Sequence, residues 1–312
     1  MISPIFSEKP THILYDVNPQ THNIRRYLNS LSLVSKQFLS ITNRLRFSLA
    51  VRNPTHPLLG RLFKRFSNLT SLDLTSFDGD LDTLLYEISN FPSLNITSLD
   101  LSYQPTIPAN GLQTFSQMIT TLTSLTCSYI VNFNSSHMFL IAECFPMLEE
   151  LNIVHTSCYD NKNYTSYCDG VEALSLALFK LRKVNLSRFP INNQLLFHLF
   201  KNCKLLQDVI MFCCDQITSA GIAYTLRERP TLRSLSFSSS PISLEFATSQ
   251  FYDSMVSLKD LTCLRLRFLN ISDDLLYSIA RESLPLTRLV LGFCTCYSYA
   301  GIFCLLSKCQ GL

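Results

Sequence analysis

A six-residue pattern with leucines at its first, fourth and sixth positions recurs along most of this chain and limits what the chain can fold into. The pattern is L-x-x-L-x-L, with Ile, Val, Cys, Met or Phe substituting at some positions. It starts at Leu69, Ile96, Leu122, Leu148, Leu181, Leu206, Leu232, Leu261 and Leu286. Successive starts lie 27, 26, 26, 33, 25, 26, 29 and 25 residues apart. This nearly constant period identifies an internal repeat.

Each occurrence begins a unit with two kinds of periodicity. Apolar and polar residues alternate within the pattern, which is typical of a strand, and apolar residues at spacings of three and four follow, which is typical of a helix. One unit cannot bury its apolar faces alone, but stacked units can. The sequence therefore predicts an α/β solenoid over 66–312, with parallel strands on the concave side and helices on the convex side. It has about nine units, and "LSKCQGL" at 306–312 begins a tenth that ends before its strand.

Basic residues are concentrated ahead of the repeats. Residues 1–65 carry ten Lys and Arg against two acidic residues, a net charge of +8, whereas the rest of the chain carries 16 against 21, a net charge of −5. This asymmetry indicates two parts with different partners. The basic part lacks the dense clusters and stacking aromatic residues of a nucleic-acid-binding segment, so we expect an acidic protein surface as its partner and no nucleic acid.

Neither a membrane span nor secretion is expected. No apolar run approaches the roughly 18–20 residues that span a bilayer. The first residues, "MISPIFSEKPTHILYDV", place prolines and charges where a secretion signal needs an apolar run. We therefore expect an intracellular protein, cytoplasmic or nuclear or both, whose 12 cysteines are reduced thiols.

Several cysteines have fixed places in the repeat. Cys214 and Cys294 lie three positions after the last apolar residue of their strands, where a small polar side chain can pair backbone groups at the bend between strand and helix. These stretches, above all "CKLLQDVIMFCCDQITSAGI", resemble the cysteine-containing class of leucine-rich repeats. Other units have an apolar residue at this cysteine position: Phe77, Ile130, Phe189 and Leu269.

No pattern in the chain predicts catalysis. The cysteine spacings between Cys294 and Cys309 fit no zinc site. The six histidines are scattered, and no G-x-S-x-G, phosphate-binding glycine loop or H-E-x-x-H is present. We expect no catalytic residues, no metal and no cofactor, and we interpret the chain as a non-catalytic binding protein.

The residues between the repeated leucines are expected to point toward the concave side. In the first three units they are serine, threonine and aspartate. Later units place Arg265 and Arg267 two strands, and Arg288 three strands, after Ile210 and Phe212. Exposed apolar residues beside arginines are typical of a recognition patch. These five residues are the predicted surface for a protein substrate; the alternative is an ordinary solvated face.

One connection between units is longer than the others. It lies between Val154 and Gly170 and contains Tyr159, Tyr164 and Tyr167. Insertions in a solenoid form loops on one edge, often the binding edge, and tyrosine provides contact area at a low entropic cost. We predict that these tyrosines contact the substrate; the alternative is a neutral surface insertion.

The stretch "YLNSLSLVSKQFLSITNRL", Tyr27 to Leu45, has apolar residues at helical spacings and predicts one or two amphipathic helices before the solenoid. Within it, "SLSLVSKQFLSI" resembles the second half of an F-box, and the matching positions are Leu33, Val34, Lys36 and Phe38. An F-box followed by cysteine-containing repeats is the layout of the plant-type F-box/LRR proteins. The resemblance implies a substrate receptor of a Skp–cullin–F-box ubiquitin ligase, in which these four residues bind the Skp-type adaptor and the repeats bind the protein to be degraded.

The resemblance sets the expected domains: a divergent leader over 1–26, a partial F-box-like segment and basic linker over 27–65, and the solenoid over 66–312. The leader lacks the Leu-Pro pair that opens the family's F-box. One alternative is therefore a scaffold that has lost adaptor binding. A second alternative is an extracellular leucine-rich-repeat receptor fragment, because N-x-S/T triplets begin at Asn68, Asn95, Asn134, Asn163, Asn185 and Asn270.

Overall fold

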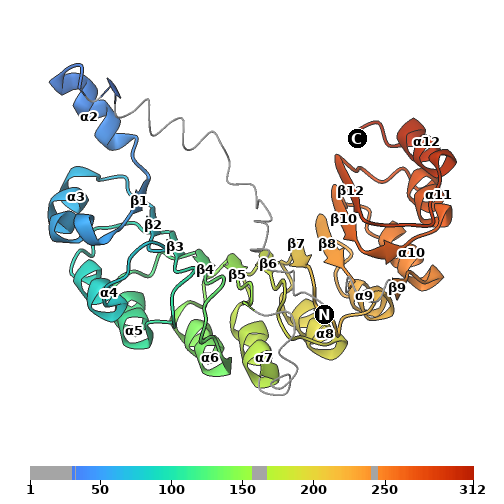
Figure 1. The fold of residues 1–312 in the computed structure, drawn as a ribbon, viewed down its shortest axis with the longest axis horizontal. Coiled ribbons are helices and arrows are strands. Elements are labelled where there is room, and N and C mark those ends of the chain that lie inside the picture. The colour runs from blue at the N-terminus through green and yellow to red at the C-terminus, as the bar shows by residue number, and fades with distance from the viewer. Residues whose placement is uncertain (1–29, 32, 157–166, 240–244) are drawn as a thin grey trace, which may run out of the picture.

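The computed structural model describes residues 30–31, 33–156, 167–239 and 245–312. The described chain forms an open arc, with strands along its concave side and helices in a row on its convex side (Figure 1). The strands form a ten-stranded parallel sheet in the order of the sequence. They are β1 (Ser48–Ala50), β2 (Ser71–Asp73), β3 (Ser98–Asp100), β4 (Ser124–Thr126), β5 (Glu150–Asn152), β6 (Lys183–Asn185), β7 (Asp208–Met211), β8 (Ser234–Ser238), β10 (Cys263–Arg267) and β12 (Arg288–Gly292). A two-stranded sheet pairs β9 (Glu245–Phe246) with β11 (Leu269–Asn270). The predicted α/β solenoid is confirmed.

The central apolar residues of neighbouring strands pair with one another along the sheet. The row runs through Leu72, Leu99, Leu125, Leu151, Val184, Val209, Leu235, Leu264 and Leu289. From Leu72 to Leu264 its members are at most 2% exposed. Because side chains alternate between the two faces of a strand, a shift by one residue would turn this row to solvent. Burial of the repeated leucines therefore fixes the register.

The sheet begins earlier than residue 66, where we predicted the solenoid to start. β1 pairs with β2, with Leu49 opposite Leu72. This register places Arg46 opposite Leu69, so the first leucine of the pattern is missing from this unit. The Arg46 guanidinium instead lies 5.5 Å from the centre of the Phe66 ring. The predicted basic linker thus contains a complete strand of the sheet.

The helices that follow the strands are α3 (Leu59–Arg65), α4 (Leu81–Ser89), α5 (Ala109–Met118), α6 (Ser135–Cys144), α7 (Cys168–Ala177), α8 (Asn193–Asn202), α9 (Ser219–Leu226), α10 (Ser249–Val256), α11 (Asp273–Arg281) and α12 (Tyr299–Lys308). A short 3-10 helix, η1 (Asn53–Leu58), precedes α3. Many of these helices begin after a side chain that accepts a hydrogen bond from a first-turn N–H, which satisfies a donor the helix leaves unpaired. These capping residues are Asp80, Asn134, Asn192, Thr218, Thr248, Ser272 and Ser298.

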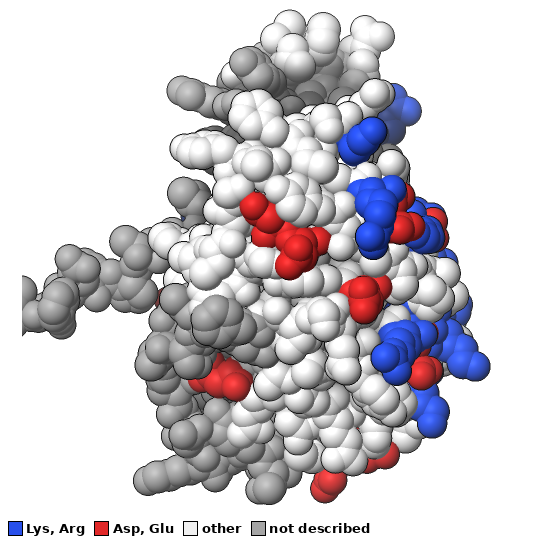
Figure 2. Space-filling model, turned by 90° about the vertical axis from the view of Figure 1, so that its right-hand side faces the viewer, with Lys and Arg blue, Asp and Glu red and all other residues white. Residues whose placement is uncertain are grey.

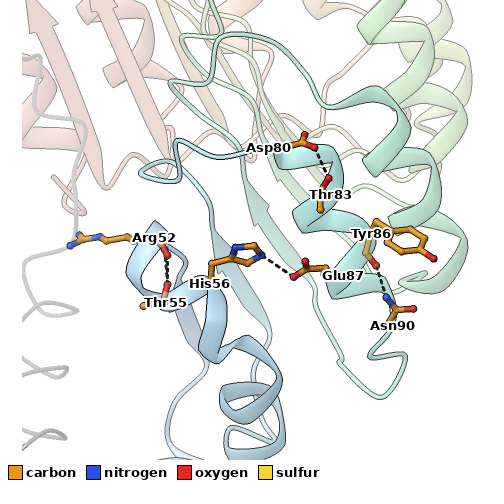
Figure 3. A network of polar contacts seen from close by, with 8 residues as sticks. All are labelled: Arg52, Thr55, His56, Asp80, Thr83, Tyr86, Glu87 and Asn90. Carbon is orange, nitrogen blue, oxygen red and sulfur yellow. Dashed lines mark hydrogen bonds and ion pairs between the residues drawn. The ribbon is translucent and has the colours of Figure 1, made fainter.

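An ionisable pair joins the first unit to the second, and local hydrogen bonds surround it (Figure 3). His56 of η1 and Glu87 of α4 are 2.8 Å apart between Nε2 and Oε2. The start of η1 is held by Thr55, whose hydroxyl accepts from the N–H of Arg52 and donates to the Arg52 carbonyl, both at 2.7 Å. The unit that contains β1, η1 and α3 therefore continues the array.

Glycines allow close approach between neighbouring helices. The N–H of Gly111 in α5 donates to Oδ1 of Asp82 in α4 at 2.6 Å. A methyl group on Gly111 would lie 2.8 Å from Cα of Asp82 and 3.0 Å from its carbonyl oxygen. Both are backbone atoms, so rotating a side chain cannot relieve the overlap. Glycines in equivalent early helical positions also lie close to the preceding helix, but mainly to its side chains: Gly170, Gly221 and Gly301.

We expect Gly111→Ala to lower the free energy of unfolding by about 1–3 kcal/mol, because the added methyl forces α4 and α5 apart. Gly60→Ala is the matched control. Its methyl would meet only the Phe91 ring, at 3.5 Å, and alanine favours a helix by about 0.5–1 kcal/mol over glycine. Urea unfolding followed by circular dichroism measures both. Equal or higher stability of Gly111→Ala would contradict the steric argument.

The end of the arc that carries α12 exposes aromatic side chains. Figure 2 shows this end with Lys and Arg gathered along one side and acidic residues scattered over an otherwise uncharged face. Tyr299 and Phe303 of α12 are 86% and 72% exposed. The last described unit therefore leaves apolar side chains uncovered. Among the residues that the structure describes, no helix has the length and apolarity to cross a membrane.

Candidate functional site

A groove of about 600 Å³ lies on the concave side. Its lining residues come from every strand from β4 to β12 in the main sheet and from the loops at their ends. The groove contains all five residues predicted on this side: Ile210, Phe212, Arg265, Arg267 and Arg288. The structure thus brings the predicted apolar and basic residues into one site.

Two serines explain how residues from separate strands meet. In strand register, Ser236 of β8 lies between Ile210 of β7 and Arg265 of β10. Both Ser236 and Ser238 are at most 1% exposed although they belong to the concave side. These short side chains form a floor over which the Arg267 guanidinium reaches Phe212, 4.9 Å from its ring centre. This cation–π contact holds the guanidinium beside the apolar wall of the groove.

Polar atoms without partners lie in or beside the same groove. Nε of Arg265, the hydroxyl of Ser236 and Oδ1 of Asp208 are buried and make no hydrogen bond within the described residues. A buried polar group without a partner costs about 1–3 kcal/mol. The groove and its surroundings therefore contain donor and acceptor atoms that the described residues do not pair.

A second row of residues follows the strands and was not predicted from the sequence. Six non-glycine residues in this row have positive φ: Tyr103, Tyr129, Arg188, Cys213, Phe268 and Phe293. Each immediately precedes the cysteine position of its repeat. This left-handed conformation costs about 1–2 kcal/mol per residue, and inter-strand bonds such as that from the N–H of Tyr103 to the carbonyl of Ser128, at 2.9 Å, help to hold it.

This row adds side chains to the rim of the groove. Arg188, Cys213 and Phe268 line it, while Phe268 also stacks on Phe293 at 5.0 Å between ring centres. Farther along the arc, Tyr103 and Tyr129 stack at 5.2 Å. The position before the repeated cysteine is the sequence signal that could have identified these residues.

The tyrosines of the long connection do not join the site as a group. Tyr159 and Tyr164 lie outside the described residues. Tyr167 is only 7% exposed, and its hydroxyl donates to the carbonyl of Phe133 at 2.8 Å. The prediction that Tyr167 contacts a substrate is therefore wrong, since its ring packs inside the solenoid against Phe189, 5.2 Å away.

The cysteine at the bend pairs backbone atoms as predicted. Sγ of Cys214 lies 3.1 Å from the carbonyl oxygen of Leu186, and Sγ of Cys294 lies 3.5 Å from that of Leu266. Burial raises the pKa of the Cys214 thiol to about 12, which keeps its proton available for donation. Within the described part of the chain, no group of three His, Cys, Asp or Glu residues is arranged to hold a metal ion.

The F-box-like residues lie at the N-terminal end of the arc, on and just before α2 (Lys36–Arg44) (Figure 1). Ser35 caps this helix by accepting from the N–H of Phe38 at 3.2 Å. Leu33, Val34 and Phe38 are 88%, 64% and 41% exposed, and Lys36 is also exposed.

Two hydrogen bonds fasten the end of α2 to the solenoid. Nε of Arg65 donates to Oδ1 of Asn43 at 2.9 Å, and Nδ2 of Asn68 donates to the carbonyl of Arg44 at 3.0 Å. The helix is thus attached at its carboxyl end, and much of its apolar surface remains open.

No protein-family model matches this sequence. The leucine-rich repeat-containing protein LegL7 from Legionella pneumophila is 14% identical, with a TM-score of 0.53 over 91% of this chain and 94% of that one. A chain of the Rad7 and Elc1 complex of yeast is also 14% identical, with a TM-score of 0.53 over 90% of this chain and 84% of that one. Together with the repeat, these similarities show that the chain has a leucine-rich-repeat fold.

Proposed function

We propose that this protein is a non-catalytic substrate-recognition subunit of a Skp–cullin–F-box ubiquitin ligase. In this proposal, Leu33, Val34, Lys36 and Phe38 bind a Skp-type adaptor, and the concave groove binds the protein to be ubiquitinated. The observation that carries it is the exposed F-box-like run at one end of a solenoid that presents a separate groove. The two surfaces would let one chain connect a ligase to its substrate.

The exposure of the F-box-like residues supports a partner at this position. Leu33 and Val34 immediately precede α2, and Phe38 lies in its first turn. Together they present apolar surface, which marks interaction sites when it is contiguous. Lys36 and the acid-free segment around it suit an acidic partner.

The yeast structure supports the proposal through its fold. It is a complex of Rad7 with Elc1, and one of its chains resembles this solenoid. A chain of this architecture therefore occurs in an assembly with a second protein. We extend that property to the present chain as part of the proposal.

The scaffold alternative shares the groove but requires no adaptor. The receptor alternative has less support, because two of its candidate glycosylation sites are buried: Asn185 is 5% exposed and Asn270 is 9% exposed. Oδ1 of Asn185 also accepts hydrogen bonds from the N–H and hydroxyl of Ser187. A glycan on Asn185 would disrupt these contacts.

Adaptor capture tests the ligase proposal. We expect the full chain to retain a purified Skp-type adaptor in a pull-down, and a Val34→Asp, Phe38→Asp double variant to lose at least about tenfold in affinity, because charges replace apolar contacts. The substitutions lie on exposed positions, so circular dichroism should show an unchanged fold. Deleting residues 1–65 would be a poor test because it removes β1 from the sheet.

Phe139→Asp is the matched control, since Phe139 is 46% exposed on α6, away from the F-box-like segment. It should leave adaptor capture unchanged. Absence of capture by the unmodified full chain would exclude the ligase role and favour the scaffold alternative. Equal loss in the control and the double variant would also contradict the proposed contact.

A further inference from the structure

Positive charge exceeds negative charge in the concave groove. Its lining includes five basic residues, Lys183, Arg188, Arg265, Arg267 and Arg288, and one acidic residue, Glu150. Lys183 lies between Glu150 and Asp208 in strand register, so its charge has acidic neighbours. The excess of positive charge is therefore concentrated at the four arginines.

Three of these arginines have no carboxylate partner among the described residues. Within the described chain, Arg188, Arg265 and Arg267 form no ion pair with a carboxylate within 4.0 Å. Nε of Arg265 is buried without a hydrogen-bond partner. A guanidinium can bind a carboxylate through two parallel hydrogen bonds, so these three arginines suit a ligand that carries carboxylates.

Apolar residues on the same groove distinguish its chemistry from that of a simple anion site. Ile210 and Phe212 are partly exposed beside the arginines, and Phe268 lines the rim. Inorganic anions would leave these side chains without a contact. A polypeptide with both carboxylates and apolar side chains would use both parts of the groove.

The extent of the groove suits an extended segment. The lining crosses seven neighbouring strands, from β4 to β12 in the order of the sheet. At about 4.8 Å between neighbouring strands this is roughly 29 Å, the length of about nine extended residues at about 3.3 Å each. The chemistry and length therefore favour a peptide over a compact ligand.

We propose that the groove binds an extended acidic segment of a partner protein, with carboxylates on Arg188 and Arg265 and an apolar side chain against Ile210 and Phe212. This inference rests on the proposed function, in which the concave side binds a protein substrate. It adds the chemical class of the recognised segment. Adaptor binding on α2 is independent of it.

The test uses fluorescence anisotropy of the full chain with a labelled peptide of about nine residues that alternates Glu with Leu and Phe. A matched peptide has Gln in place of Glu, and a single-stranded RNA of similar length tests nonspecific attraction to polyanions. We expect the acidic peptide to bind at least about tenfold more tightly than the Gln peptide, with affinity falling as salt is raised. Equal binding of the two peptides, or tighter binding of the RNA, would overturn the proposal.

Charge reversal tests the position of the site. Arg188→Glu should weaken the acidic peptide by about tenfold or more, whereas the Gln peptide should change little. Arg61→Glu, an equal charge change at an exposed residue of α3, is the control. Arg265→Gln provides a second variant that keeps a polar side chain. Equal effects of Arg188→Glu and Arg61→Glu would overturn the location in the groove.

The adaptor experiment separates this proposal from the ligase proposal. If Arg188→Glu leaves peptide binding unchanged while the Val34→Asp, Phe38→Asp variant loses the adaptor, the acidic-segment inference fails and the ligase proposal stands. If the acidic peptide binds the groove but the full chain captures no adaptor, the ligase proposal fails and the acidic-segment inference stands.

Discussion

Phe189→Ala is expected to lower the free energy of unfolding by about 3–5 kcal/mol, the usual loss for truncating a buried phenylalanine. Phe189 is 1% exposed. Its ring lies 5.2 Å from Tyr167, 5.9 Å from His155 and 6.0 Å from Phe133, measured between ring centres. Removing it leaves a cavity between units on either side of the long connection, where closely packed neighbours cannot fully collapse.

Chemical unfolding in urea, monitored by circular dichroism and fluorescence, measures this loss. Phe179→Ala is the matched control because Phe179 is 54% exposed, and we expect it to change stability by less than about 0.5–1 kcal/mol. Similar losses for the two variants would contradict the assigned role of the aromatic cluster. In a repeat array, the Phe189→Ala transition should also broaden if neighbouring units become uncoupled.

The period of the leucines was sufficient to predict the solenoid because each unit repeats the same burial requirement. It placed the strands from β2 to β12 in the main sheet, all of which are present. It missed β1 because Arg46 occupies the place of the first leucine and packs over Phe66. A pattern defined by apolar residues does not detect an arginine, even where the arginine packs in the place of a leucine.

The concave site was partly predictable for a related reason. Strand alternation assigned Ile210, Phe212 and the three arginines to one side, and parallel register brought them together. Alternation is lost in the bend that follows, however, so it gave no placement for Arg188 or Phe268. Their position depends on the left-handed backbone, which side-chain periodicity does not encode.

The position of Tyr167 in the long connection was not enough to predict whether its side chain is exposed. A tyrosine in an insertion can contact a partner, but its ring can equally fill the interior if the hydroxyl finds an acceptor. The carbonyl of Phe133 is that acceptor. It comes from another unit, and such a long-range pairing has no signal in the local sequence.

The cysteine position was recognised in two units, but a different residue serves it near the start of the array. Gln104 occupies the same place in its repeat and is 5% exposed. Its Nε2 donates to the carbonyl of Leu74 at 2.8 Å and to that of Phe77 at 3.0 Å. The Leu74 carbonyl is the counterpart of the Leu186 carbonyl that Cys214 contacts. The longer Gln104 side chain thus donates to the carbonyl that corresponds to the one contacted by Cys214, and it also reaches a second carbonyl.

Gln104→Glu tests the importance of this contact because it replaces the amide donor with a carboxyl group of the same size. Near neutral pH we expect a loss of about 3–5 kcal/mol, since a buried carboxylate would face two carbonyl oxygens without a compensating charge. Burial and these oxygens should raise the pKa of the introduced carboxyl above its unfolded value of about 4.3. The protonated form can donate to a carbonyl, so stability relative to the unmodified protein should be greatest below that unfolded pKa.

Ionisation of the introduced carboxyl is less favourable in the folded protein than in the unfolded chain. The stability of the variant relative to the unmodified protein should therefore fall as pH rises above the unfolded pKa and through the carboxyl's pKa in the folded protein. Urea midpoints across this pH range measure the change. Gln117→Glu makes the same chemical change at an exposed position of α5 and should show little relative loss. A pH-independent effect of Gln104→Glu would contradict donation by Gln104 as the cause, because steric disruption would not follow the protonation of the carboxyl.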